Sequence, residues 1–125
     1  MPPRPSRNAW AVIALLGASL LISLINLADP SALPPEALVW TGFAALAHLA
    51  LIPLAWRGYR WAFIGAAVLA ALNVIVTSFN PVDPYYLTHW DDPIESFLVV
   101  LEGYALPLPL IFFAFRAHRE TRRAQ

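Results

Sequence analysis

The chain has 125 residues, of which 59% are hydrophobic and only 13% are charged, and its mean hydropathy is +0.60. This length is too short for two domains and this composition is too apolar for an ordinary soluble domain, so the lipid bilayer is the expected solvent. Cysteine is absent, which excludes disulfides, thiolate metal sites, iron–sulfur clusters and a cysteine nucleophile. The net charge is zero, but positive and negative residues occupy different parts of the chain.

Four apolar stretches are each long enough to cross a bilayer, which takes about 20 mainly apolar residues. They run approximately over residues 9–27, 36–56, 61–79 and 95–115. Pro53 predicts a bend near the end of the second stretch, and Pro107 and Pro109 predict a kink in the fourth. The sequence therefore predicts an all-α integral membrane protein with a single domain, an antiparallel bundle of four transmembrane helices.

The distribution of charge predicts how these helices are oriented. All eight basic residues are arginines, and each lies before the first stretch, between the second and third, or after the fourth. The other connections, near residue 29 and over the outer loop 80–94, carry acids and no arginine. Because arginine-rich short loops remain in the cytoplasm, both termini and the basic tail 116–125 are predicted to be cytoplasmic. Arginine without lysine, together with abundant alanine and proline, suggests a prokaryotic source and hence the cell (inner) membrane.

Polar residues recur at helical spacing within the apolar stretches, where each needs another helix, a cavity or a partner subunit to face. One interpretation is a single intramembrane polar pocket in the outer half of the bundle, lined by Glu102, His48, Asn73, Thr77, Asn26, Ser23 and Thr41. The other interpretation is that the serines, threonines and asparagines form packing contacts between helices, as they commonly do in membrane bundles.

Glu102 has the clearest functional potential, because an intramembrane carboxylate is costly and no arginine lies at its depth. Desolvation predicts that this carboxyl group is protonated in the resting protein. Counting 1.5 Å per residue places Glu102 and Asn73 both roughly 9–10 Å below the outer surface, so Asn73 is its predicted hydrogen-bond partner. A structural pairing and a role as a proton carrier both remain open.

His48 is the one histidine within the apolar stretches. A bis-histidine haem site needs two imidazoles inside the membrane, so a single chain would supply half of one, and a dimer would be needed for the rest. His89 falls in the outer loop and His118 in the basic tail. The sequence thus requires no cofactor, although haem binding or an enzymatic role for His48 is an alternative.

The outer loop gathers several residues that could bind a cation, namely Asp83, His89, Asp91, Asp92 and Glu95. Their spacing matches no dedicated Ca²⁺ or Zn²⁺ motif. The loop also carries tyrosines and a tryptophan, which are typical of a segment that lies along the membrane interface.

No catalytic, cofactor or transport motif stands out in the chain. The leading hypothesis is therefore a non-enzymatic accessory or assembly subunit of a larger membrane complex or of a homo-oligomer, whose partners are the lipid bilayer and other protein subunits. Nucleic-acid binding is not needed to explain the arginine-rich tail. The alternatives are a small proton-coupled transporter or channel that uses Glu102, and a haem-binding or enzymatic membrane protein that uses His48.

Overall fold

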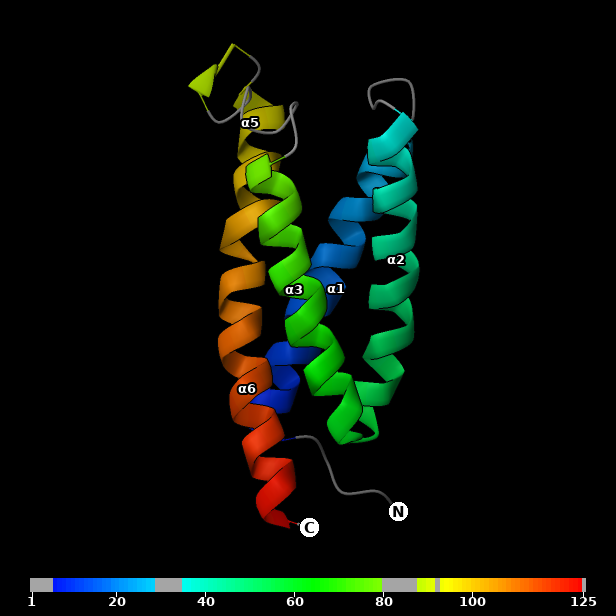
Figure 1. The fold of residues 1–125 in the computed structure, drawn as a ribbon, viewed down its shortest axis with the longest axis vertical. Coiled ribbons are helices and arrows are strands. Elements are labelled where there is room, and N and C mark those ends of the chain that lie inside the picture. The colour runs from blue at the N-terminus through cyan, green and yellow to red at the C-terminus, as the bar shows by residue number, and fades with distance from the viewer. Residues whose placement is uncertain (1–5, 29–34, 80–87, 92, 125) are drawn as a thin grey trace.

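The structure, a computed structural model, describes residues 6–28, 35–79, 88–91 and 93–124. Its elements are α1 (Arg7–Ala28), α2 (Pro35–Trp56), α3 (Arg60–Phe79), α5 (Pro93–Val100), the π-helical segment η2 (Leu101–Ala105) and α6 (Pro107–Ala124). The segments α5, η2 and α6 follow one another as a single rod, the fourth of the bundle (Figure 1). The described part of the chain is thus all-helical, and it contains four helices long and apolar enough to span a membrane.

The four rods run alternately up and down. Helix α1 packs against α2 and α6, and α3 packs against α6 and α2, whereas α1 and α3 barely touch. Helix α1 begins and α6 ends at the same end of the bundle, where the short α2–α3 turn also lies (Figure 1). We call this the inner end, and we call the end that carries α5 the outer end. This arrangement brings all the described arginines to the inner end and agrees with the antiparallel bundle expected from the sequence.

The basic segment predicted as a tail continues the fourth rod, because α6 is helical to Ala124. Two arginines of this segment lie over aromatic rings one turn earlier: Arg116 is 5.4 Å from the ring centroid of Phe112, and Arg119 is 5.9 Å from that of Phe115. These cation–π contacts favour continued helix, since residues four apart lie on one face. The predicted end at residue 115 marks where the apolar stretch ends and not where the helix ends.

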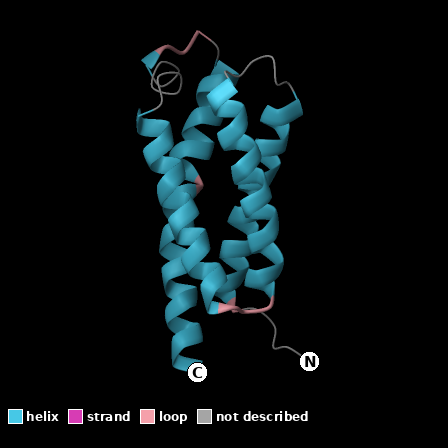
Figure 2. Cartoon of the chain, turned by 45° about the vertical axis from the view of Figure 1, so that its right-hand side comes forward, coloured by secondary structure: helices cyan, strands magenta, loops and turns pink. Residues whose placement is uncertain are grey.

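The fourth rod is interrupted where the two prolines predicted a kink. The amide of Leu106 donates to the carbonyl of Leu101, five residues back, at 2.9 Å, and α6 begins at Pro107. Proline suits the first position of a helix because no amide is needed there. Figure 2 shows the interruption as a loop-coloured point within an otherwise helical rod.

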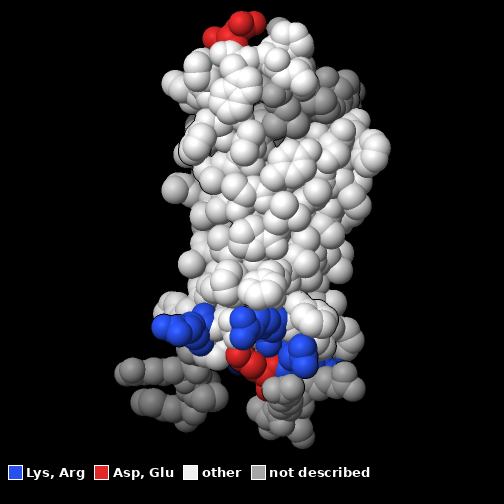
Figure 3. Space-filling view, turned by 90° about the vertical axis from the view of Figure 1, so that its left-hand side faces the viewer, with Lys and Arg blue, Asp and Glu red and all other residues white. Residues whose placement is uncertain are grey.

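Large and small side chains are distributed in the reverse of a soluble bundle. Small residues fill the interior, including Ala62, Ala66 and Ala70 of α3, and small side chains let another helix approach closely. Large apolar side chains cover the outside, for example Val39 with 74% of its surface exposed and Leu46 with 70%. Each such side chain is worth about 1.5–3 kcal/mol when moved out of water, so this exterior calls for an apolar solvent. Figure 3 shows charged side chains at the two ends of one face and none across its middle.

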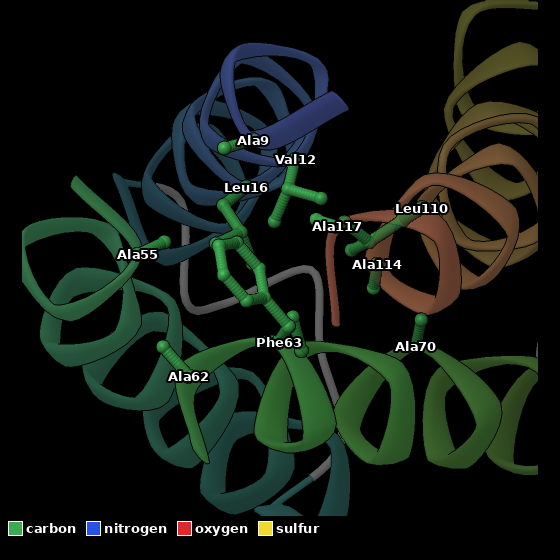
Figure 4. Packing of buried hydrophobic residues seen from close by; sticks show 11 residues of the cluster. Ala9, Val12, Leu16, Ala55, Ala62, Phe63, Ala70, Leu110, Ala114 and Ala117 are labelled. Atoms are coloured by element: carbon green, nitrogen blue, oxygen red, sulfur yellow. The ribbon is translucent and has the colours of Figure 1, made fainter. Parts of the chain in front are cut away.

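The buried core is divided along the length of the bundle. Its inner half is apolar and consists of Ala9, Val12, Leu16, Ala55, Ala62, Phe63, Ala66, Ala70, Leu110, Ala114 and Ala117 (Figure 4). Alanines allow the backbones to approach, and the ring of Phe63 fills the space between α1, α2 and α6. The buried polar side chains lie from mid-bundle to the outer end: Ser19, Ser23, Thr41, His48, Asn73, Thr77 and Ser96.

This division predicts that two phenylalanines of α3 contribute very differently to the free energy of unfolding. Phe63 is 1% exposed in the inner core and Phe79 is 84% exposed at the outer end of α3. Phe63→Ala should lower the free energy of unfolding by about 3–5 kcal/mol, because a core cavity is left behind. Phe79→Ala should change it little, and equal losses in thermal unfolding of the two purified variants would contradict the packing described.

Candidate functional site

Glu102 lies in η2 and is held by two side chains of α1. Ser23 donates from Oγ to the carboxyl Oε1 at 3.4 Å, and Asn26 donates from Nδ2 to Oε2 at 3.0 Å. Ser23 is completely buried, and Glu102 and Asn26 are partly buried. Three residues of the predicted polar pocket are therefore brought together, and their hydrogen bonds connect the fourth rod to the first.

The backbone around Glu102 is wider than an ordinary helix. The bond from Leu106 to Leu101 closes a π-type turn, which holds one more residue than an α-turn. Pro107 contributes to this local geometry because it has no amide to donate to the preceding turn. Single π-turns within helices occur often at functional sites, so the location of the one carboxyl side chain of η2 in such a turn marks this site as a candidate.

Gly103 brings the same turn against α3. A Cβ atom at this position would lie 2.4 Å from Thr77 Cγ2 and 2.7 Å from Thr77 Oγ1, closer than real contacts allow. The next residue, Tyr104, shares a hydrogen bond of 2.8 Å with Ser78 through its hydroxyl group. The π-turn is thus fixed between two helices, to α1 through Glu102 and to α3 through Gly103 and Tyr104.

Asn73 is buried on α3, with 5% of its surface exposed. Two hydrogen bonds to Glu102 come from Ser23 and Asn26 of α1, and the pairing of Glu102 with Asn73 stays a prediction. Counting residues from the helix ends gives the depth of a residue along the bundle but not the direction of its side chain. The side of η2 that faces α1 depends on the π-turn. Thr41 of α2 is also buried, at 8% exposed.

His48 lies near the middle of the bundle and is 1% exposed. Its Nδ1 is 2.5 Å from the carbonyl oxygen of Ala44, one turn earlier, which makes Nδ1–H the donor and leaves Nε2 as an acceptor. This Nε2 is buried and has no partner among the described atoms. An imidazole fixed in this way has the tautomer of a metal ligand. The described residues, however, contain no group of three His, Cys, Asp or Glu side chains that could hold a metal ion.

The predicted outer-loop cation site falls mostly outside the described residues. Asp83 and Asp92 lie outside them, as does the side chain of Glu95. His89 and Asp91 are exposed, and His89 Nδ1 shares a hydrogen bond of 2.9 Å with Thr88 Oγ1. The cation-binding interpretation of this loop therefore stays a prediction.

Two features of the site were not identified from the sequence. Ser96 is fully buried at the start of the fourth rod, where its hydroxyl donates to the carbonyl oxygen of His89 at 3.3 Å. The second is Gly103, which lets α3 approach η2 closely. Its position directly after Glu102 and four residues before Pro107 could have indicated this close contact from the sequence. Glycine beside a proline-released turn commonly marks a close backbone approach.

The described residues thus form a helical bundle in which four helices are long and apolar enough to span a membrane, with a partly buried carboxyl group in its outer half. Comparison with known protein families, with curated proteins and with solved structures found no match for the chain. Its function is therefore argued from its own residues.

The contact between Gly103 and Thr77 yields a prediction. Gly103→Ala should lower the free energy of unfolding by about 1–3 kcal/mol, the usual cost of overpacking, because the added methyl group meets Thr77. Gly42→Ala is the matched control, since a Cβ atom there would meet nothing within 4 Å. Thermal unfolding in detergent measures both.

Replacing Thr77 by alanine in the Gly103→Ala background removes the two atoms that a new Cβ would meet most closely. This second change should recover part of the lost stability. If Gly103→Ala is as stable as Gly42→Ala, α3 does not approach η2 as closely as described.

Proposed function

We propose that this chain is a multi-pass protein of the cell (inner) membrane of a prokaryote, with both termini in the cytoplasm. In this proposal it works as a non-enzymatic accessory or assembly subunit of a larger membrane complex or of a homo-oligomer. The basis for the orientation is the position of the arginines at the inner end, because short basic segments remain cytoplasmic.

The observation that carries the accessory role is the apolar inner core. A conducting path through one bundle needs polar or water-accessible positions along its length. The inner half of this bundle is filled instead by close-packed alanines and by three larger side chains that are each at most 1% exposed, namely Leu16, Phe63 and Leu110. A role that uses the outer surface of the bundle fits this interior better than one that uses its axis.

The orientation predicts which engineered cysteines an impermeant maleimide will label in intact cells. The chain has no native cysteine, so each label reports on one site. Thr88→Cys, near the outer end, should react in intact cells. Ala124→Cys, in the last residue of α6, should react only after the membrane is permeabilised. The reverse pattern would overturn the proposed topology.

The accessory role predicts a stable assembly in the membrane. Extraction with a mild detergent should give a particle that contains protein well beyond one 13.8 kDa chain, and a harsh detergent should reduce it to that chain. Native mass spectrometry distinguishes copies of this chain from other subunits. Recovery of the monomer alone, under conditions that preserve other membrane complexes, would contradict the proposal.

A small proton-coupled transporter or channel is the second candidate, and Glu102 in the interrupted rod favours it. The apolar inner core means that such a path needs a second copy or a rearranged bundle. Proton movement into liposomes that contain the purified protein distinguishes the candidates. Movement that is lost in Glu102→Gln supports the transporter, and the absence of movement in the wild type supports the accessory subunit.

A further inference from the structure

The fourth rod has fewer backbone donors than acceptors immediately after Glu102. In an α-helix, the carbonyls of Gly103, Tyr104 and Ala105 accept from the amides of residues 107, 108 and 109. Residues 107 and 109 are prolines and have no amide hydrogen. Only the amide of Leu108 remains for these three carbonyls.

The neighbouring amides are already engaged. Leu106 donates to Leu101 at 2.9 Å, and Leu110 donates to Leu106 at 3.1 Å. At least two of the three carbonyl oxygens of residues 103–105 therefore lack a full helical hydrogen bond. Within a bilayer each such oxygen is costly unless another donor or a cation approaches it, since there is no bulk water.

Side-chain oxygens gather at the same turn. The carboxyl group of Glu102 meets the Ser23 hydroxyl and the Asn26 amide, and the Thr77 hydroxyl lies against Gly103. Carboxylate, hydroxyl and carbonyl oxygens are the donors that hard cations prefer. Interrupted membrane helices use released carbonyls in this way to coordinate Na⁺ or protons.

The charge of the site selects a monovalent cation. Glu102 is the one acid among the described residues of this turn, and the described arginines lie at the opposite end of the bundle (Figure 3). A single carboxylate neutralises one positive charge. A divalent cation would leave an uncompensated charge in a medium of low dielectric constant, where charges are strongly disfavoured.

We propose that the Glu102 carboxylate, with Ser23, Asn26 and the released carbonyls of η2, binds one Na⁺ ion in competition with a proton. Both states satisfy the site. The ionised carboxylate accepts from Ser23 and Asn26 while it binds the cation. The protonated carboxyl group donates its hydrogen to the Ser23 hydroxyl or to a released carbonyl, and its other oxygen still accepts from Asn26. This inference goes beyond an accessory role and requires no transport.

Infrared difference spectroscopy of the purified full-length protein tests the competition. At neutral pH and constant ionic strength, choline chloride should give the stretching band of a protonated carboxyl group, and NaCl should remove it. Glu102→Gln should show no such band in either salt. Glu120→Gln, which removes an exposed acid at the inner end, is the matched control and should respond as the wild type does.

Thermal unfolding supplies a second measurement, since a ligand that binds only the folded state stabilises it. NaCl should raise the midpoint relative to choline chloride in the wild type. Asn26→Ala should raise the Na⁺ concentration needed for this stabilisation about tenfold. A tenfold weaker affinity corresponds to about 1.4 kcal/mol, as expected for the loss of one charge-assisted hydrogen bond. Pro107→Ala restores an amide donor for the Gly103 carbonyl. This variant should also bind Na⁺ more weakly, although its Glu102 carboxylate is unchanged.

Three results overturn the proposal. The first is a wild-type protein whose carboxyl band and unfolding midpoint are the same in Na⁺ and choline. The second is a Na⁺ response that survives in Glu102→Gln. The third is Mg²⁺ acting at lower concentration than Na⁺, which would contradict the charge argument. The wild-type comparison decides the question even if Glu102→Gln does not fold.

Discussion

The four long helices are apolar enough to span a membrane, and a bilayer would offer no water to their backbone and side-chain polar groups. The other features of the structure are consistent with that constraint. It makes helix the default for the described chain, because a helix pairs its own amides and carbonyls. It also directs the polar side chains inward and the large apolar ones outward. The interior is rich in small residues such as alanine, serine and threonine, which allow helix backbones to approach closely, as at Gly103 and Thr77. Helices lined with leucine could not approach one another so closely.

The two halves of the bundle satisfy the same constraint by different means. In the inner half, close packing around Phe63, Leu16 and Leu110 stabilises the helices through dispersion. In the outer half, hydrogen bonds such as those from Ser23 and Asn26 to Glu102 connect helices that are distant in sequence. The hydrogen bonds to Glu102 therefore lie in the outer half, away from the apolar core.

The π-turn is the part of the bundle in which backbone polar groups have the fewest helical hydrogen-bond partners. Pro107 and Pro109 remove donors that hydrocarbon does not replace, and the fourth rod responds with a bond five residues back and with a carboxyl group in the same turn. Two outcomes are physically consistent with such a turn. Another helix or a cation completes the missing contacts, or the rod is free to change its local winding. Both make the turn around Glu102 the position at which a small ligand or a partner would alter this bundle most.

The sequence by itself determined the helical class, the four long apolar stretches and the interruption near Pro107, because these follow from local composition and helical periodicity. It also identified Glu102, Ser23 and Asn26 as polar residues that need partners. Only the tertiary structure decided that Ser23 and Asn26 of α1 donate hydrogen bonds to Glu102. It likewise decided that Gly103 sets the spacing to α3 and that the basic tail continues α6. Depth in a membrane can be counted along one helix, but direction depends on how helices rotate against one another, and that rotation is set by packing over the whole bundle.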